Sequence, residues 1–276
     1  MQPASPSPSG RALRAIVRKD VTVALSSKAV SVPFVMVPLI VMVGLPLLLA
    51  LLAPRTAAGM GQLADQLETL SPDLVARVSG LDPDQQAVVL GLVYLLAPLF
   101  LIVPLMVASV LAADSFAGEK ERGTLEALVY SPISDRDLML AKMLSAWLPA
   151  VVVGCICFVV YCVTANVAAW PTMGRVFMPT TMWLVLLVWV MPAAAAVGLG
   201  TSVIVSSRVR TFQEAYQLGG VVVLPIVALM IGQVTGLMYF SAWLVVLLGL
   251  VLWLAAAALL WLGARSLRRT ELIARL

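Results

Sequence analysis

Long, uninterrupted apolar runs dominate this chain of 276 residues. A bilayer core is about 30 Å thick, and a helix rising about 1.5 Å per residue crosses it with roughly 20 apolar residues. Six runs reach that length: 32–53, 87–113, 144–168, 180–205, 215–233 and 242–264. None of them alternates apolar and polar positions, as the strands of a membrane barrel do. The pattern predicts an all-α integral membrane protein with six transmembrane helices.

The segment before the first run predicts two further parts. Residues 1–10 are rich in Ser and Pro, a composition typical of a disordered tail. Residues 11–31 place apolar side chains on one helical face and arginines on its flank, which predicts an amphipathic helix lying in the membrane interface. The alternative is a helix that continues into the first span. Val32–Pro33 and Pro38 disfavour that continuation, because the residue before a proline avoids the helical conformation.

The distribution of basic residues predicts the orientation. Fifteen of the eighteen Lys and Arg residues lie before the first run, in the second and fourth connections, and after the last run. An excess of basic residues marks the cytoplasmic side. We therefore expect both termini, the segment 114–143 and the basic tail 265–276 in the cytoplasm, with 54–86 as an outer loop. The Arg-over-Lys and Ala/Val/Leu-rich usage indicates a GC-rich bacterium, so the expected location is the inner membrane of a bacterial cell.

Composition narrows the function classes. With 62% hydrophobic and 12% charged residues, the chain is too apolar for a soluble domain. The net charge of +4 is spread between apolar runs and forms no basic face, which argues against nucleic acid as a partner. The chain has no histidine, so it lacks the commonest metal ligand and the usual base for a Ser or Cys nucleophile. No Gly-Lys-Ser/Thr loop for nucleotide phosphates is present. We expect neither catalysis nor a bound cofactor or metal.

The second connection holds the most informative pattern. A run of four charged residues, Glu119–Arg122, is followed by Gly123, which interrupts the helix. Thr124 then caps a short helix with an apolar face, which Ser131-Pro132 ends. Such an amphipathic element suits docking in a groove of another protein. A solvated loop without a partner fits the same spacing equally well.

The string FAGEKERGTLEALVYSPIS, residues 116–134, resembles the signature of permease subunits of type-2 ATP-binding-cassette exporters. The resemblance implies the six-span fold of that family, with a coupling helix in this segment that contacts a separate ATPase. It assigns the coupling role to Glu119, Lys120, Glu121, Arg122, Gly123, Thr124, Leu125, Glu126, Leu128, Ser131 and Pro132. It also implies two ATPase subunits that bind ATP and Mg, and a second copy of this chain or a similar permease.

A second stretch, Arg210–Gly220, resembles the entry to the fifth span in the sodium-efflux-like branch, although Tyr216 departs from the pattern there. Sodium is not carried over as the cargo. Conspicuous polar side chains in or near the spans are candidate substrate ligands: Asn166, Gln217 and Gln233. Hydrogen bonding between helices is the commoner role of such residues. The expected function is an exporter permease for an amphiphilic or hydrophobic substrate; the alternative is a six-span scaffold or assembly factor that transports nothing.

Overall fold

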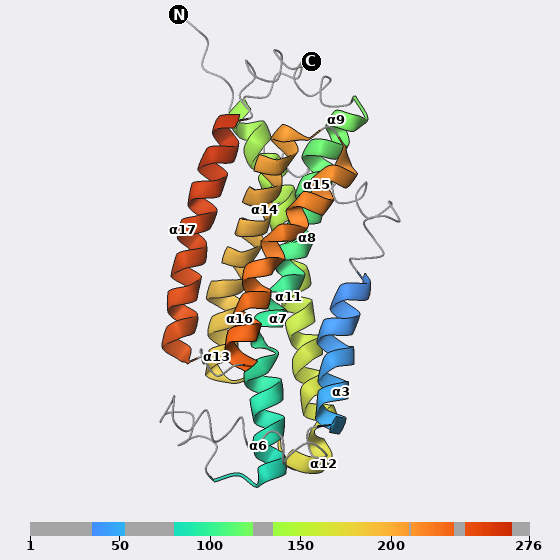
Figure 1. Cartoon of the computed structure of the whole chain (residues 1–276), viewed down its shortest axis with the longest axis vertical. Coiled ribbons are helices and arrows are strands. Elements are labelled where there is room, and N and C mark those ends of the chain that lie inside the picture. Colours follow the sequence, from blue (N-terminus) through green and yellow to red (C-terminus); the bar gives the residue numbers. More distant parts are fainter. Residues whose placement is uncertain (1–34, 53–79, 124–134, 210, 235–240, 267–276) are drawn as a thin grey trace, which may run out of the picture.

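The protein is a bundle of long helices running along one common direction (Figure 1). The computed structural model describes residues 35–52, 80–123, 135–209, 211–234 and 241–266. No strand occurs in these ranges. Several expectations fall outside them: the tail 1–10, the interfacial helix 11–31, most of the outer loop 54–86, the helix within 124–134 and most of the tail 265–276.

Six helices are long and apolar enough to cross a membrane, as predicted: Val35–Leu52, Pro83–Glu121, Leu138–Ala168, Thr181–Arg208, Phe212–Gln233 and Trp243–Gly263. The first contains the π-turn η1 (Ile40–Gly44) and α3 (Leu45–Leu52). The second is built from α6 (Pro83–Val89), the π-turn η3 (Leu90–Leu95), α7 (Ala97–Phe100), α8 (Ile102–Ala113), the π-turn η4 (Asp114–Gly118) and α9 (Glu119–Glu121). The third is α11 (Asp135–Ala168).

The short helix α12 (Trp170–Met173) leads toward the fourth span. That span combines α13 (Thr181–Val185), the π-turn η5 (Leu186–Val190) and α14 (Met191–Arg208). The fifth combines α15 (Phe212–Gly219), the 3-10 turn η6 (Gly220–Val223) and α16 (Leu224–Val234), and the sixth is α17 (Ala242–Ser266). The second and third helices extend past their predicted spans, 87–113 and 144–168. A span predicted from hydropathy ends at the first charged residue. The helix itself can continue beyond that point when its charged side chains have ion-pair or hydrogen-bond partners.

The second and fourth spans form the centre of the bundle. Of the most apolar window of each, 72% and 67% is buried, against 17% for the first, fifth and sixth spans. Small residues of α14 permit this contact, since a Cβ on Gly198 would lie 2.4 Å from the carbonyl oxygen of Leu105 in α8. Ser202 of α14 donates to the carbonyl oxygen of Ser109 at 2.9 Å. The backbones of the two helices therefore touch, as small residues allow in membrane bundles.

Indole groups connect the helices through backbone carbonyls. Trp183 of α13 donates to the carbonyl oxygen of Val93 in η3 at 2.8 Å. In the π-register that carbonyl would pair with residue 98, which is a proline and has no N–H. The Tyr161 ring stacks on Trp183 at 4.5 Å, and its hydroxyl donates to the neighbouring carbonyl of Leu92. Trp183 and Tyr161 thus satisfy backbone groups in a region where lipid and apolar side chains offer no alternative.

Replacing Trp183 with Phe is expected to destabilise the protein by about 1–3 kcal/mol, because the buried carbonyl of Val93 loses its donor. The measurement is the thermal unfolding midpoint of the detergent-solubilised protein. Trp243→Phe is the matched control, since Trp243 is 75% exposed and its indole lies on the outside of the bundle. Equal midpoints for the two variants would show that the Trp183 bond contributes nothing.

Candidate functional site at one end of the second helix

Charged residues gather where the second helix ends, at α9. This helix lies at the opposite end of the bundle from α12 (Figure 1). We call this group the charge cluster; it comprises Asp114, Glu119, Lys120, Glu121, Arg122 and Lys142. The first five lie on η4, α9 and the residue that follows, and Lys142 lies on α11. Gly123 adopts a left-handed conformation with φ of 67° just after the helix, which is the predicted interruption.

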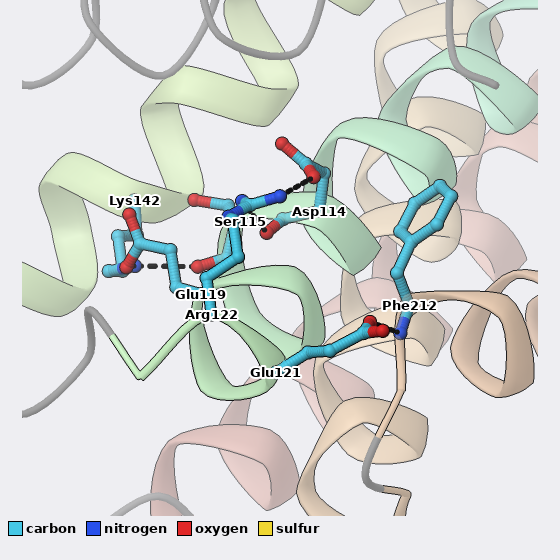
Figure 2. A network of polar contacts seen from close by, with 7 residues as sticks. All are labelled: Asp114, Ser115, Glu119, Glu121, Arg122, Lys142 and Phe212. Atoms are coloured by element: carbon cyan, nitrogen blue, oxygen red, sulfur yellow. Dashed lines mark hydrogen bonds and ion pairs between the residues drawn. The ribbon is translucent and has the colours of Figure 1, made fainter. Parts of the chain in front are cut away.

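The most buried part of the charge cluster is an ion pair between the second and third helices. Lys142 contacts the carboxylate of Glu119, and both side chains are only 5% exposed (Figure 2). Lys142 also donates to the carbonyl oxygen of Ser115 at 2.6 Å. Its ammonium group lies 5.3 Å from the centre of the Phe116 ring. A buried cation needs such a set of partners, because leaving water is costly for a charge.

A second, more exposed ion pair joins two residues at the end of the second helix. Arg122 contacts the carboxylate of Asp114 at 3.0 Å, with the arginine side chain 46% exposed (Figure 2). The pair spans Gly118, where a Cβ would lie 2.7 Å from the Asp114 carboxylate and 3.1 Å from the guanidinium. Glycine at this position therefore leaves the room that the pair occupies.

Two further charged residues reach the junction between the fourth and fifth spans. Lys120 donates to the carbonyl oxygen of Val209 at 3.2 Å, just after α14. Glu121 accepts from the backbone N–H of Phe212 at 2.8 Å and so caps the start of α15 (Figure 2). Thr211 caps the same helix by accepting from the N–H of Glu214. Three consecutive residues, 119 to 121, thus attach the second helix to the third, fourth and fifth.

Sequence reasoning did not assign Lys142 or Asp114 to the site. Lys142 counted only toward the orientation of the chain, although a lysine beside an apolar run was a signal that an acid should lie nearby. Of the residues to which the resemblance assigned a coupling role, Glu119 to Gly123 are described. The others, Thr124, Leu125, Glu126, Leu128, Ser131 and Pro132, lie outside the described residues. The coupling role therefore stays a prediction.

The three candidate substrate ligands lie on two spans, Asn166 on the third and Gln217 and Gln233 on the fifth. Gln217 is exposed on α15. Gln233 on α16 is buried, and neither its amide nitrogen nor its amide oxygen has a hydrogen-bond partner within the described part of the chain. Asn166 on α11 is fully engaged: its amide nitrogen donates to the carbonyl oxygens of Cys162 and Met178, and its oxygen accepts from the N–H groups of Phe177 and Met178. Within the described residues, no hydrogen bond joins any two of the three candidates.

Asn166→Ala is expected to cost about 2 kcal/mol, because it removes the partners of three backbone groups in the connection before α13. The unfolding midpoint in detergent measures the loss, and Gln217→Ala, at an exposed position, serves as the control. A substrate ligand without a structural role would instead leave the midpoint of Asn166→Ala at that of the control.

Metal-binding side chains do not gather in the described ranges, where no group of three or more His, Cys, Asp or Glu residues is suitably placed. Cys155, Cys157 and Cys162 are free thiols on α11. The charge cluster makes ion pairs and caps that attach helices to one another.

Comparison with known proteins gives one finding. A family model described as ABC-2 family transporter protein matches residues 14–243, which includes every described helix up to the start of α17. No curated protein and no solved structure matches the chain.

Proposed function

We propose that the chain forms an outward path for an amphiphilic or hydrophobic substrate. It belongs to the ABC-2 family of transporter proteins and is thus the membrane component of an ABC transporter. Two separate ATPase subunits drive it, and a second permease, either the same chain or a similar one, completes the path. The setting is a bacterial inner membrane. The charge cluster and both termini face the cytoplasm, in agreement with the basic residues on that side.

The charge cluster carries this proposal. The second helix is continuous up to Glu121, which lies inside the string 116–134 that resembles the coupling signature, and the rest of that string follows the helix directly. A partner that pushes on this segment acts on the end of a helix whose apolar window is 72% buried in the bundle. The attachments of Glu119, Lys120 and Glu121 connect that end to three other spans. Force applied at one cytoplasmic point is therefore distributed through the domain.

The driving subunits are separate because this chain has no nucleotide loop. Its four lysines follow Arg, Ser, Glu and Ala, so none of them belongs to a Gly-Lys-Ser/Thr sequence. ATP and Mg are bound by the partner ATPase subunits. The predicted spans hold no charged residue, which argues against a proton- or ion-coupled transporter working alone.

Co-purification tests the proposal. A tagged chain expressed in its own host and extracted in mild detergent is expected to capture an ATP-binding subunit. Glu126→Lys, within the segment that resembles a coupling helix, is expected to lower the captured amount at least about tenfold, since a reversed charge opposes a complementary surface. Arg175→Gln changes the charge of an exposed residue after α12 and should capture the wild-type amount.

The alternative function predicts a different set of partners. A six-span scaffold or assembly factor would purify at full yield with other proteins and no ATP-binding subunit. Equal capture of the ATPase by Glu126→Lys and by the wild type would remove the coupling segment from the proposal and leave the family assignment in place.

A further inference from the structure

We propose that Lys142 is a positioning residue of the transport cycle: through Glu119 and Ser115 it locks the end of the second helix to the third, so that a displacement of the coupling segment moves both helices together. This inference rests on the proposed function as an ATPase-driven permease. Lys142 lies outside the segment that resembles a coupling helix, and no resemblance assigns it a role.

The burial of the pair is the first argument. Glu119 and Lys142 are each 5% exposed, whereas Arg122 in the neighbouring pair is 46% exposed. Apolar residues of similar volume replace a buried ion pair at equal or better stability in many proteins. Stability alone therefore does not explain a buried pair here. A buried pair does impose geometry, because each charge is strongly penalised when it separates from the other.

The second argument is where Lys142 holds the helix. It binds the carbonyl oxygen of Ser115 within the π-turn η4 and the carboxylate of Glu119, the first residue after that turn. One ammonium group thus bridges the turn and ties both ends of it to α11 (Figure 2). A π-turn is a local widening of the helix and a natural place for it to bend. With Lys142 in place, the bend and α11 cannot move independently.

The third argument is the contrast with the other attachments. Lys120 and Glu121 each make one bond to a backbone group at the junction of α14 and α15, and the Glu121 bond is exposed to solvent. An exposed single bond exchanges readily for water. The end of the second helix therefore has one buried ion-paired attachment, to the third helix, and two single bonds to backbone groups, one at the end of the fourth span and one at the start of the fifth. This arrangement lets the second and third helices move as a unit relative to the fifth.

The test uses the complex of the chain with its co-purified ATPase, reconstituted in liposomes and supplied with MgATP alone. The variants are Lys142→Gln, Lys142→Arg and the exchange E119K/K142E, with Arg175→Gln as the control. ATP hydrolysis that depends on the permease is the first readout. The amount of bound ATPase and the thermal midpoint of the complex are the second and third.

Lys142→Gln is expected to keep its ATPase but to lose permease-dependent hydrolysis by roughly tenfold, the usual size of a coupling between sites. Lys142→Arg keeps both bonds and should retain most of the hydrolysis. The exchange restores the ion pair without the Ser115 bond and should recover to within roughly threefold of the wild type, if coupling is carried mainly by the pair. Recovery of hydrolysis by a charge exchange is a readout that mere misfolding does not produce.

Three outcomes would overturn the inference. Wild-type hydrolysis in Lys142→Gln would show that the lock transmits nothing. An exchange variant that regains its thermal midpoint and bound ATPase but no hydrolysis would reduce the pair to a structural role. If Lys142→Gln does not fold, Lys142→Arg and the exchange decide the question in the same way. A wild-type chain that binds no ATPase would instead overturn the proposed function, and the transmission role with it.

Discussion

Gly198→Ala is expected to destabilise the bundle by about 3 kcal/mol and to lower the yield of folded protein sharply. The added Cβ would lie 2.4 Å from the carbonyl oxygen of Leu105 and 2.8 Å from the hydroxyl of Ser109. The first obstacle is backbone, so a rotamer change cannot relieve it, and α8 and α14 must separate. Overpacking of a tight core costs about 1–3 kcal/mol, and a backbone clash belongs at the upper end.

The matched control is Gly220→Ala, at a position where an added Cβ meets nothing within 4 Å. Alanine is a better helix former than glycine by about 1 kcal/mol, so the control should be neutral or slightly stabilising. Thermal unfolding in detergent and the monodisperse fraction after size exclusion measure both variants. A Gly198→Ala protein as stable as Gly220→Ala would refute the close contact between α8 and α14.

Lys142→Met is the second large effect, with an expected loss of about 3–5 kcal/mol. It leaves the carboxylate of Glu119 buried without its cation, and it removes the donor to the carbonyl oxygen of Ser115. The double variant Glu119→Gln with Lys142→Met should recover most of the loss, because no buried charge remains. Arg122→Gln, which breaks the more exposed pair with Asp114, should cost only about 0–1 kcal/mol.

The double-mutant cycle is measured by chemical or thermal unfolding in detergent. Additive losses in the double variant would mean that Glu119 and Lys142 do not interact, and a loss in Arg122→Gln as large as in Lys142→Met would mean that burial does not distinguish the pairs. The burial of Glu119 also decides which residue to change in the test of ATPase capture. A reversed charge at Glu119 would place two cations together in the interior, so Glu126 is the cleaner position for testing contact with an ATPase.

The six spans follow from local sequence, and the small residues around Gly198 are of the kind that lets two helices approach closely. A bilayer sets the length of an apolar run, and a glycine among alanines permits helices to touch. The extension of the second helix to Glu121 did not follow, because the partner that satisfies Glu119 lies 23 residues further on. The bond from Trp183 to Val93 spans 90 residues and depends on a π-turn, which shifts the register without changing the composition.

The candidate site was predicted in part. Glu119 to Arg122 stood out as a charged run before an interrupting glycine, and Gly123 indeed has the left-handed conformation. Their partners were beyond sequence reasoning, because Lys142, Val209 and Phe212 are brought to the same end only by the packing of four spans. The residues from Thr124 to Pro132 rest on resemblance alone, so their contact with an ATPase stays a prediction.

The charged run Glu119–Arg122 contacts other helices in two directions. Glu119 points into the bundle and pairs with Lys142, whereas Lys120 and Glu121 hold the junction before the fifth span. The string that resembles the coupling signature thus includes residues whose contacts are to other helices of the same chain. In the proposed cycle, ATPase closure moves the segment after Gly123, and the pair of Glu119 with Lys142 carries that displacement into the third span. The single bonds of Lys120 and Glu121 let the second and third helices move relative to the fifth.

The central claim is that this chain is the permease subunit of a transporter driven by separate ATPase subunits. Native mass spectrometry of the complex purified from its own host membranes tests it. The predicted result is a particle holding two permease chains, one of them this chain of 29.3 kDa, and two ATP-binding subunits. Addition of MgATP should leave that composition intact. A particle of this chain alone, or with partners that bind no nucleotide, would contradict it.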